Sequence, residues 1–279
     1  MGRGIEKLSL HKFDSFENLT FDSKEYSKLK FGNKLVADRY GKELAQLFFD
    51  NYLHILLSEE VVIAESAYNY VKNAASLITD SFYDELNKLI IELNCSKITR
   101  VKINRTIPYT TDYGTLNKEQ RTKLLEKDEF TLDYDFVNNK FIVFIDDVYI
   151  SGTHHSKIEE TVKKYKIPFN KCLCLYYGEY LGDNGYDIES KLNFAYIKDS
   201  SQIDETMLPI VRVLKMTLGL AHEDFLDFIS KRSKSYLYIY FSLSLGEGYY
   251  KNPNYQNNLN FLKNKLNDLF WLINYLKFS

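Results

Sequence analysis

The order of apolar and polar positions along the chain predicts a core in which strands alternate with helices. Short apolar runs bounded by polar residues predict strands at 61–64, 98–104, 141–145, 171–177 and 193–197. Stretches whose apolar residues recur every three or four positions predict helices at 34–57, 71–93 and 155–166. Strands separated by helices favour a parallel sheet. We therefore expect an α/β fold in which helices flank a parallel sheet.

Beyond about Glu205 the pattern predicts helices only. One helical face is indicated by apolar residues at Leu259, Leu262, Leu266, Leu269, Ile273 and Leu276. Pro253 and the Asn-rich segment from Asn252 to Asn260 predict a loop before this last helix. We expect three parts: an N-terminal segment and helix at 1–58, an α/β core at 59–204 and an all-helical C-terminal extension at 205–279.

Two aspartates follow the most apolar of the predicted strands. Phe141 to Ile145 suits a strand that is buried on both faces of a parallel sheet, so Asp146 and Asp147 lie at its carboxyl end. In open α/β sheets, ligands bind at that end of the strands. The aspartates are therefore candidate binding or catalytic residues.

The turn that comes next has the composition of a phosphate-binding loop. It consists of Ile150, Ser151, Gly152, Thr153 and His154, and a helix is predicted directly after it. Gly152 allows a tight turn whose N–H groups converge, and the hydroxyls of Ser151 and Thr153 add donors. The positive end of the helix dipole also favours an anion. The alternative is a strand, an acidic turn and a helix N-cap without a ligand.

The run 145–153, Ile-Asp-Asp-Val-Tyr-Ile-Ser-Gly-Thr, resembles the signature of type I phosphoribosyltransferases. The resemblance implies a Rossmann-like parallel sheet of that family's kind. It also implies that Asp146 and Asp147 hold the ribose 2′- and 3′-hydroxyls of phosphoribosyl pyrophosphate (PRPP), while residues 150–154 bind its 5′-phosphate. His154 departs from the pattern, which has Thr or Ser there. The backbone N–H remains, and an imidazole can also donate to phosphate.

A second stretch resembles the competence-protein-F-like branch of the same family. Residues 100–106 and 112–121 are similar to its second strand and to the flexible loop that closes over pyrophosphate. Residues 65–73 match the position of its pyrophosphate loop. The resemblance implies that the cations facing the leaving group are Lys72, Arg100, Arg105, Lys118 and Arg121. The alternative is a solvated hairpin with ordinary surface charges.

The resemblance implies a phosphoribosyltransferase that moves phosphoribose from PRPP to an unidentified acceptor and releases pyrophosphate. Mg²⁺ is the expected cofactor, held through the diphosphate and ribose oxygens of the ligand and not directly by the protein. One alternative is a non-catalytic PRPP-binding regulator. Another is an effector of a bacterial defence or conflict system, similar in kind to the phosphoribosyltransferase-like proteins that accompany retrons.

Composition and charge limit the cellular location and the binding partners that we expect for this protein. The net charge of −2 gives no overall attraction to nucleic acid or anionic membranes. No apolar stretch is long enough to span a membrane, and the N-terminus lacks the hydrophobic core of a signal peptide. Cys172 and Cys174 share an apolar run without a second Cys or His pair at zinc spacing, which favours buried thiols. We expect a cytoplasmic protein without a membrane partner.

The helical extension is rich in aromatic residues. Lysines lie among tyrosines at Tyr236, Tyr238, Tyr240, Tyr249, Tyr250 and Tyr255. Such residues can stack on bases, but the pattern favours an aromatic-rich helical core. The N-terminal part is a candidate hood over the acceptor. The C-terminal helices are candidates for capping the site, for homo-oligomer assembly, or for contact with a protein or nucleic-acid partner.

Overall fold

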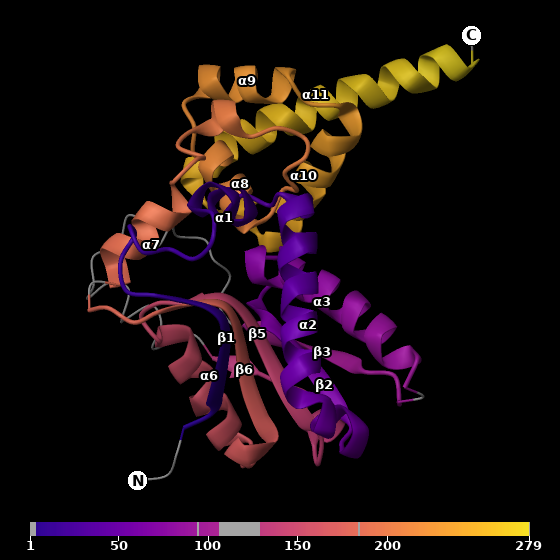
Figure 1. Ribbon diagram of the computed structural model, residues 1–279. Helices are drawn as coiled ribbons and strands as arrows, with labels where there is room; N and C mark the ends of the chain where they lie inside the picture. The colour runs from indigo at the N-terminus through magenta and orange to yellow at the C-terminus, as the bar shows by residue number, and fades with distance from the viewer. Residues whose placement is uncertain (1–3, 94, 106–128, 184, 279) are drawn as a thin grey trace.

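The computed structural model describes residues 4–93, 95–105, 129–183 and 185–278, with side chains up to residue 267 (Figure 1). Its centre is a six-stranded sheet in the order β1-β6-β5-β2-β3-β4. Neighbouring strands are parallel, except that β3 and β4 are antiparallel. The strands are β1 (Glu6–Phe13), β2 (Val61–Tyr68), β3 (Thr99–Arg105), β4 (Phe130–Thr131), β5 (Phe141–Tyr149) and β6 (Cys172–Tyr180). This mostly parallel sheet confirms the predicted α/β class.

Helices cover both faces of the sheet. One face is covered by α2 (Lys34–Ser58) and α3 (Ala74–Ile91), and the other by α6 (Thr153–Lys164), as Figure 1 shows. A short helix, α5 (Tyr134–Val137), precedes β5. Along β5, Val143 belongs to the core cluster under α2 and α3, whereas Ile142 belongs to the cluster under α6. The central strand is therefore buried on both faces, as its apolar run predicted.

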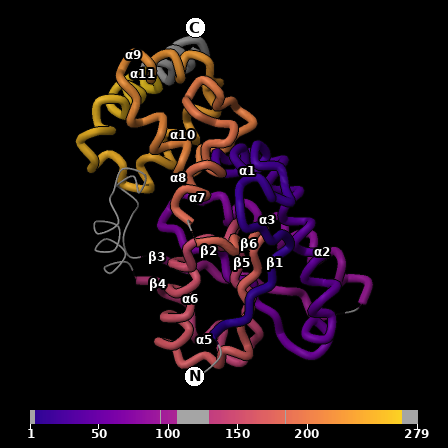
Figure 2. Tube along the Cα trace, turned by 60° about the vertical axis from the view of Figure 1, so that its left-hand side comes forward, coloured from indigo at the N-terminus to yellow at the C-terminus, as the bar shows by residue number. Residues whose placement is uncertain are grey.

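The remaining helices gather beyond the carboxyl ends of the parallel strands, in both views (Figures 1 and 2). They are α1 (Ser23–Lys30), α7 (Gly185–Asn193), α8 (Val211–Leu218), α9 (His222–Ser230), α10 (Lys234–Glu247) and α11 (Pro253–Phe278). Four of the predicted core tyrosines, Tyr236, Tyr240, Tyr249 and Tyr255, are buried. The division of the chain at residues 58 and 204 stays a prediction.

The predicted strand at 193–197 is wrong. The helix α7 ends at Asn193, and the segment that follows has no strand pairing. Ser27 of α1 supplies the hydrogen bonds instead: its hydroxyl donates to the carbonyl of Asn193 at 2.9 Å and accepts from the N–H of Ile197 at 3.0 Å. Because a buried serine satisfies this backbone, Ile197 is buried without entering the sheet, whereas Phe194 and Tyr196 are exposed.

The sequence analysis did not predict β1. This strand lies at the edge of the sheet and pairs with β6 in parallel, from Glu6 opposite Leu173 to Phe13 opposite Tyr180. Its apolar residues are separated by lysine, serine and histidine, and Phe13 is its only fully buried position. An edge strand has one hydrogen-bonded neighbour and a weak apolar pattern, which is why the segment did not stand out.

The predicted loop from Asn252 to Asn260 is also wrong, because α11 begins at Pro253. Proline suits the first turn of a helix. Asn258 is buried, and its side-chain amide donates to the carbonyls of Leu218 at 3.1 Å and Leu220 at 2.9 Å. These hydrogen bonds fasten α11 to the end of α8. Tertiary contacts therefore override the low helix propensity of asparagine.

Candidate functional site

Asp146 and Asp147 lie where the sequence placed them, near the carboxyl end of β5. This strand has parallel neighbours on both sides, β2 and β6. The Asp147 side chain is buried, and its Oδ1 accepts a hydrogen bond from the N–H of Val148 at 2.8 Å. Two carboxylates are thus held at the edge of the sheet where ligands bind in this class of fold.

Asp147 contacts a lysine from a distant part of the chain. The Nζ of Lys30, the last residue of α1, lies 2.5 Å from Asp147 Oδ2. The Lys30 side chain is only 17% exposed and that of Asp147 only 9%. A charge pair shielded from water in this way is stronger than an exposed one. Lys30 therefore fixes the orientation of Asp147 and ties α1 to the sheet.

Asp146 contacts the histidine of the predicted phosphate loop. His154 Nδ1 lies 2.6 Å from Asp146 Oδ2, and the N–H of Asp147 donates to Oδ1 at 3.0 Å. Burial alone would raise the pKa of Asp146. The charge and hydrogen bond of His154, with the charge of Lys30, outweigh burial and hold this pKa below its ordinary value. Asp146 is therefore ionised at neutral pH.

The turn between β5 and α6 has the conformation that its glycine suggested. Gly152 adopts a left-handed φ of 72°, and a Cβ there would lie 2.7 Å from the hydroxyl of Tyr149. Ser151 and Thr153 are exposed, with their hydroxyl oxygens 3.0 Å apart, while Ile150 packs partly buried against the core. The turn thus presents two hydroxyls to solvent beside the N-terminus of α6, where an anion is favoured.

Phe130 links the phosphate loop to one of the predicted cations. Its ring centroid lies 5.4 Å from that of His154, and the guanidinium of Arg105 lies 5.7 Å from the same ring. Arg105 is the last residue of β3 and is buried. The structure therefore brings Arg105 to the ring that contacts the loop. Lys118 and Arg121 lie outside the described residues.

Lys72 and Arg100 both pair with carboxylates that are separate from the acidic pair. Lys72 Nζ lies 2.7 Å from both carboxylate oxygens of Asp80, and Arg100 donates to the same group at 2.8 Å. Arg100 Nε also lies 3.4 Å from Glu65, which is buried in β2. Burial would lower the pKa of Arg100, but Asp80 and Glu65 raise it. These cations are balanced within the protein at the start of α3.

The loop between β2 and α3 is held from several sides. Lys102 Nζ donates to the carbonyl of Asn69 at 2.5 Å. Asn73 caps α3 by accepting from the N–H of Ser76 at 2.9 Å. The carboxylate of Glu247, at the end of α10, accepts from the next two N–H groups of the loop, those of Tyr70 and Val71. The C-terminal helices therefore contact the predicted pyrophosphate loop directly.

Sequence reasoning missed Lys30, Tyr26 and Glu247. Lys30 is one of several lysines between positions 24 and 34, and no spacing distinguishes it. Burial raises the pKa of Tyr26 well above its usual value, reinforced by the negative charge of Asp147, so its hydroxyl stays neutral. Glu247 carries no local signal either. All three depend on contacts between elements that are far apart in the sequence.

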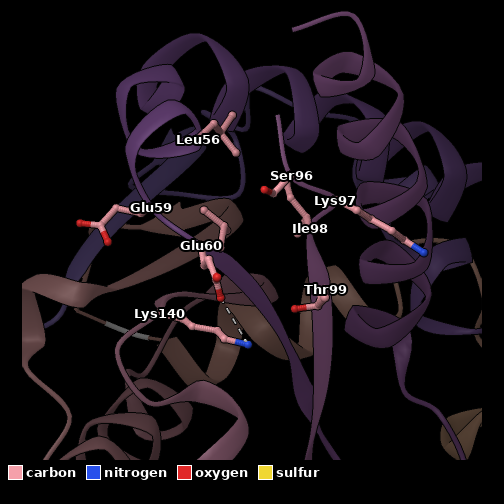
Figure 3. Close-up of a pocket in the computed structure, with 9 residues that line it drawn as sticks. Leu56, Glu59, Glu60, Ser96, Lys97, Ile98, Thr99 and Lys140 are labelled. Carbon is pink, nitrogen blue, oxygen red and sulfur yellow. Dashed lines mark ion pairs between the residues drawn. The ribbon is translucent and has the colours of Figure 1, made fainter. Parts of the chain in front are cut away.

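Two cavities lie away from the acidic pair. One, of about 200 Å³, is at the amino ends of the strands and is lined by Glu60, Val61, Thr99 and Lys140, with an ion pair of 3.7 Å between Lys140 and Glu60 (Figure 3). The other, of about 620 Å³, lies between β1 and α2 over the ring of Tyr177.

In the described part of the chain, no three His, Cys, Asp or Glu side chains come close enough together to hold a metal ion. No helix described by the structure combines the length and the apolar character needed to cross a membrane.

Comparison with known families gives one match that extends over nearly the whole chain. The model of the family described as PRTase ComF-like matches residues 5–262. The match spans the sheet, the acidic pair, the loop that follows it and most of the C-terminal helices. A search of curated proteins gives no match.

Proposed function

The chain belongs to the ComF-like phosphoribosyltransferase family, and from this premise we propose that it binds PRPP at the carboxyl end of its sheet. The bound phosphoribosyl group is transferred to an acceptor, and pyrophosphate is released. One observation carries the proposal: the buried end of β5 places an ionised acidic pair directly before a left-handed glycine turn and the N-terminus of α6.

The ribose hydroxyls are the groups that suit the acidic pair. Ionised carboxylates only accept hydrogen bonds, and two ribose hydroxyls supply two donors. Asp147 Oδ2 and Asp146 Oδ2 are the oxygens now contacted by Lys30 and His154. When ribose binds, its hydroxyls would replace Lys30 and His154 at these oxygens. The two side chains would then turn toward the phosphates of PRPP. Both carboxylates place negative charge near the sugar, which becomes cation-like as the bond to pyrophosphate breaks.

The turn that follows the acidic pair suits the 5′-phosphate of PRPP. Ser151 and Thr153 offer exposed hydroxyls, and Gly152 lets the backbone turn toward the anion. The first N–H groups of α6 have no partner within the helix and carry its positive dipole end. His154, which stands where the family has a hydroxyl residue, can donate from its ring.

The reaction needs no covalent intermediate on the protein. The bond between ribose C1 and the diphosphate oxygen breaks, and a bond forms between C1 and a nucleophilic nitrogen of the acceptor, which gives up a proton to solvent. Mg²⁺, when bound to the diphosphate, would neutralise part of the charge of the leaving group. Because the described residues do not gather three protein ligands, that ion would take most of its oxygens from PRPP and water.

The first experiment is a calorimetric titration of PRPP into the protein with and without Mg²⁺. The proposal expects Mg²⁺-dependent binding that is lost in Asp147→Asn and kept in the matched control Glu60→Gln, at the opposite end of the sheet. Release of pyrophosphate on addition of candidate acceptors then tests transfer. If PRPP does not bind, or if Asp147→Asn binds it as well as the unchanged protein, the proposal is wrong.

A non-catalytic PRPP-binding protein is the second candidate. The observation that favours it is that both carboxylates of the acidic pair are already engaged by side chains of the same protein, Asp147 by Lys30 and Asp146 by His154. Such a site would bind PRPP reversibly without turnover. Tight binding with no consumption of PRPP across a panel of nitrogen nucleophiles would favour this candidate, whereas pyrophosphate release would exclude it.

A further inference from the structure

The carboxylate of Glu247 occupies N–H groups of the loop between β2 and α3. Its Oε2 accepts from the N–H of Val71 at 2.7 Å and from that of Tyr70 at 3.0 Å. Two successive N–H groups that point at one oxygen form the kind of concavity that binds anions. The loop also leads into the N-terminus of an 18-residue helix, α3. Glu247 is therefore an anion bound at an anion site, supplied by the chain itself.

The position of Glu247 is energetically unfavourable in every respect except this contact. The residue is 1% exposed, and its second oxygen, Oε1, has no hydrogen-bond partner among the described residues. A buried carboxylate oxygen without a partner costs free energy. Glu247 is also the last residue of α10, where the helix dipole disfavours negative charge. The two loop N–H groups are the partners that offset these costs.

Further contacts join the same loop to the C-terminal helices. The ring of Tyr70 lies directly against Gly246, so closely that a Cβ on Gly246 would overlap it. The N–H of Val211, at the start of α8, donates to the carbonyl of Lys72 at 3.2 Å. Among the cations near the loop, Lys72 and Arg100 already pair with Asp80, and Lys102 donates to the carbonyl of Asn69. An incoming anion would therefore compete with Glu247 for the loop's N–H groups.

We propose that Glu247 is an internal competitor of diphosphate, so that diphosphate binding at the loop and docking of the α10 terminus onto the core exclude each other. This inference rests on the proposed function, together with the resemblance of residues 65–73 to the family's pyrophosphate loop. The C-terminal helices thereby report occupancy of the site: when the anion enters, the end of α10 leaves the loop. By reciprocity, anything that pulls α10 away raises the affinity for diphosphate.

The test compares Glu247→Gln with Glu223→Gln. The glutamine keeps the size of the side chain but is neutral, and Glu223 is an exposed glutamate of α9 in the same helical region. Inorganic diphosphate with Mg²⁺ is titrated into the full-length proteins by calorimetry. We expect Glu247→Gln to bind on the order of tenfold more tightly than the unchanged protein, a typical coupling between two sites. Glu223→Gln should bind as the unchanged protein does.

Hydrogen exchange of the unchanged protein gives a second readout that needs no variant. With diphosphate, exchange should become faster near residues 244–252, while the amides of Tyr70 and Val71 stay protected by the new anion. Equal or weaker diphosphate binding by a folded Glu247→Gln overturns the inference. If that variant does not fold, unchanged exchange at residues 244–252 overturns it.

The same titrations separate this inference from the proposed function. If PRPP binds to the unchanged protein but diphosphate affinity does not depend on Glu247, only the inference fails, and Glu247 merely fastens the loop. If neither PRPP nor diphosphate binds to any of the proteins, the proposed function fails and the inference fails with it.

Discussion

The two ends of the parallel sheet carry similar residues in different surroundings. At the carboxyl end, Asp147 pairs with Lys30 at 2.5 Å, and both side chains are largely buried. At the amino end, Glu60 pairs with Lys140 at 3.7 Å, and the Glu60 side chain is 73% exposed (Figure 3). An exposed pair contributes little because water screens it, whereas a buried charge must keep its partner.

The two ends also differ in which parts of the chain they bring together. At the carboxyl end, α1 reaches β5 through Lys30, and α10 reaches the loop that follows β2 through Glu247. At the amino end, the cavity is lined by the turns that lead into β2, β3 and β5. Charge alone therefore does not identify the candidate site. Convergence of distant elements on buried charges does.

Substitution at the acidic pair should have the largest effect. Asp147→Asn removes the charge but keeps the shape, and we expect affinity for PRPP to fall about 100-fold, the loss of charged hydrogen bonds to the ribose. Calorimetric titration measures it. Glu60→Gln is the matched control and should leave PRPP affinity unchanged. If both variants lost the same amount of PRPP affinity, the two ends of the sheet would not differ in PRPP binding.

Replacing the lysine of each ion pair should show that the two pairs contribute differently to the stability of the fold. Lys30→Met leaves the buried Asp147 carboxylate without its cation and should lower the free energy of unfolding by about 2 kcal/mol. Lys140→Met leaves an exposed glutamate and should lower it by less than about 1 kcal/mol. Urea denaturation gives both values. Comparable losses would mean that burial does not decide the strength of these pairs.

The left-handed glycine of the phosphate loop gives a smaller stability effect. Gly152→Ala places a Cβ at a φ of 72° and within 2.7 Å of the Tyr149 hydroxyl, so we expect a loss of about 1–2 kcal/mol. Thermal unfolding measures the loss. Tyr149→Phe in the same protein removes the hydroxyl contact and should recover only part of it, because the backbone strain remains. Full recovery of stability would show that the backbone strain at position 152 does not cause the loss.

The smallest effect concerns pH and His155 in the first turn of α6. Burial lowers the pKa of His155, and the charge of Lys7 adds to this, although Glu159 opposes it. The unfolded chain therefore takes up a proton before the folded one as the pH falls through about 6.5, and stability is lost below that pH. In His155→Gln the decline of the melting temperature between pH 7 and pH 5 should be shallower. Parallel curves for the two proteins would contradict this assignment.

Local sequence pattern predicted the elements that are buried on both faces. The apolar run at 141–145 gave the central strand and the position of Asp146 and Asp147, because only a strand covered on both sides needs so many apolar residues in a row. The order Ser-Gly-Thr after the acidic pair predicted the turn and the helix start. The segments at 193–197 and 252–260 were predicted wrongly, because Ser27 of α1 hydrogen-bonds the backbone of the first and Asn258 ties the second to the end of α8.

Local periodicity and short spacings along the chain were enough to predict the class of fold, the central strand, and the positions of the acidic pair and of the glycine turn after it, since these are local properties. Only the tertiary structure decided which partners those residues meet. Lys30 reaches Asp147 across 117 positions, and Glu247 reaches Val71 across 176. Such contacts depend on how α1 and α10 pack over the sheet. No spacing along the chain encodes them, because burial selects one lysine or glutamate from many chemically identical ones.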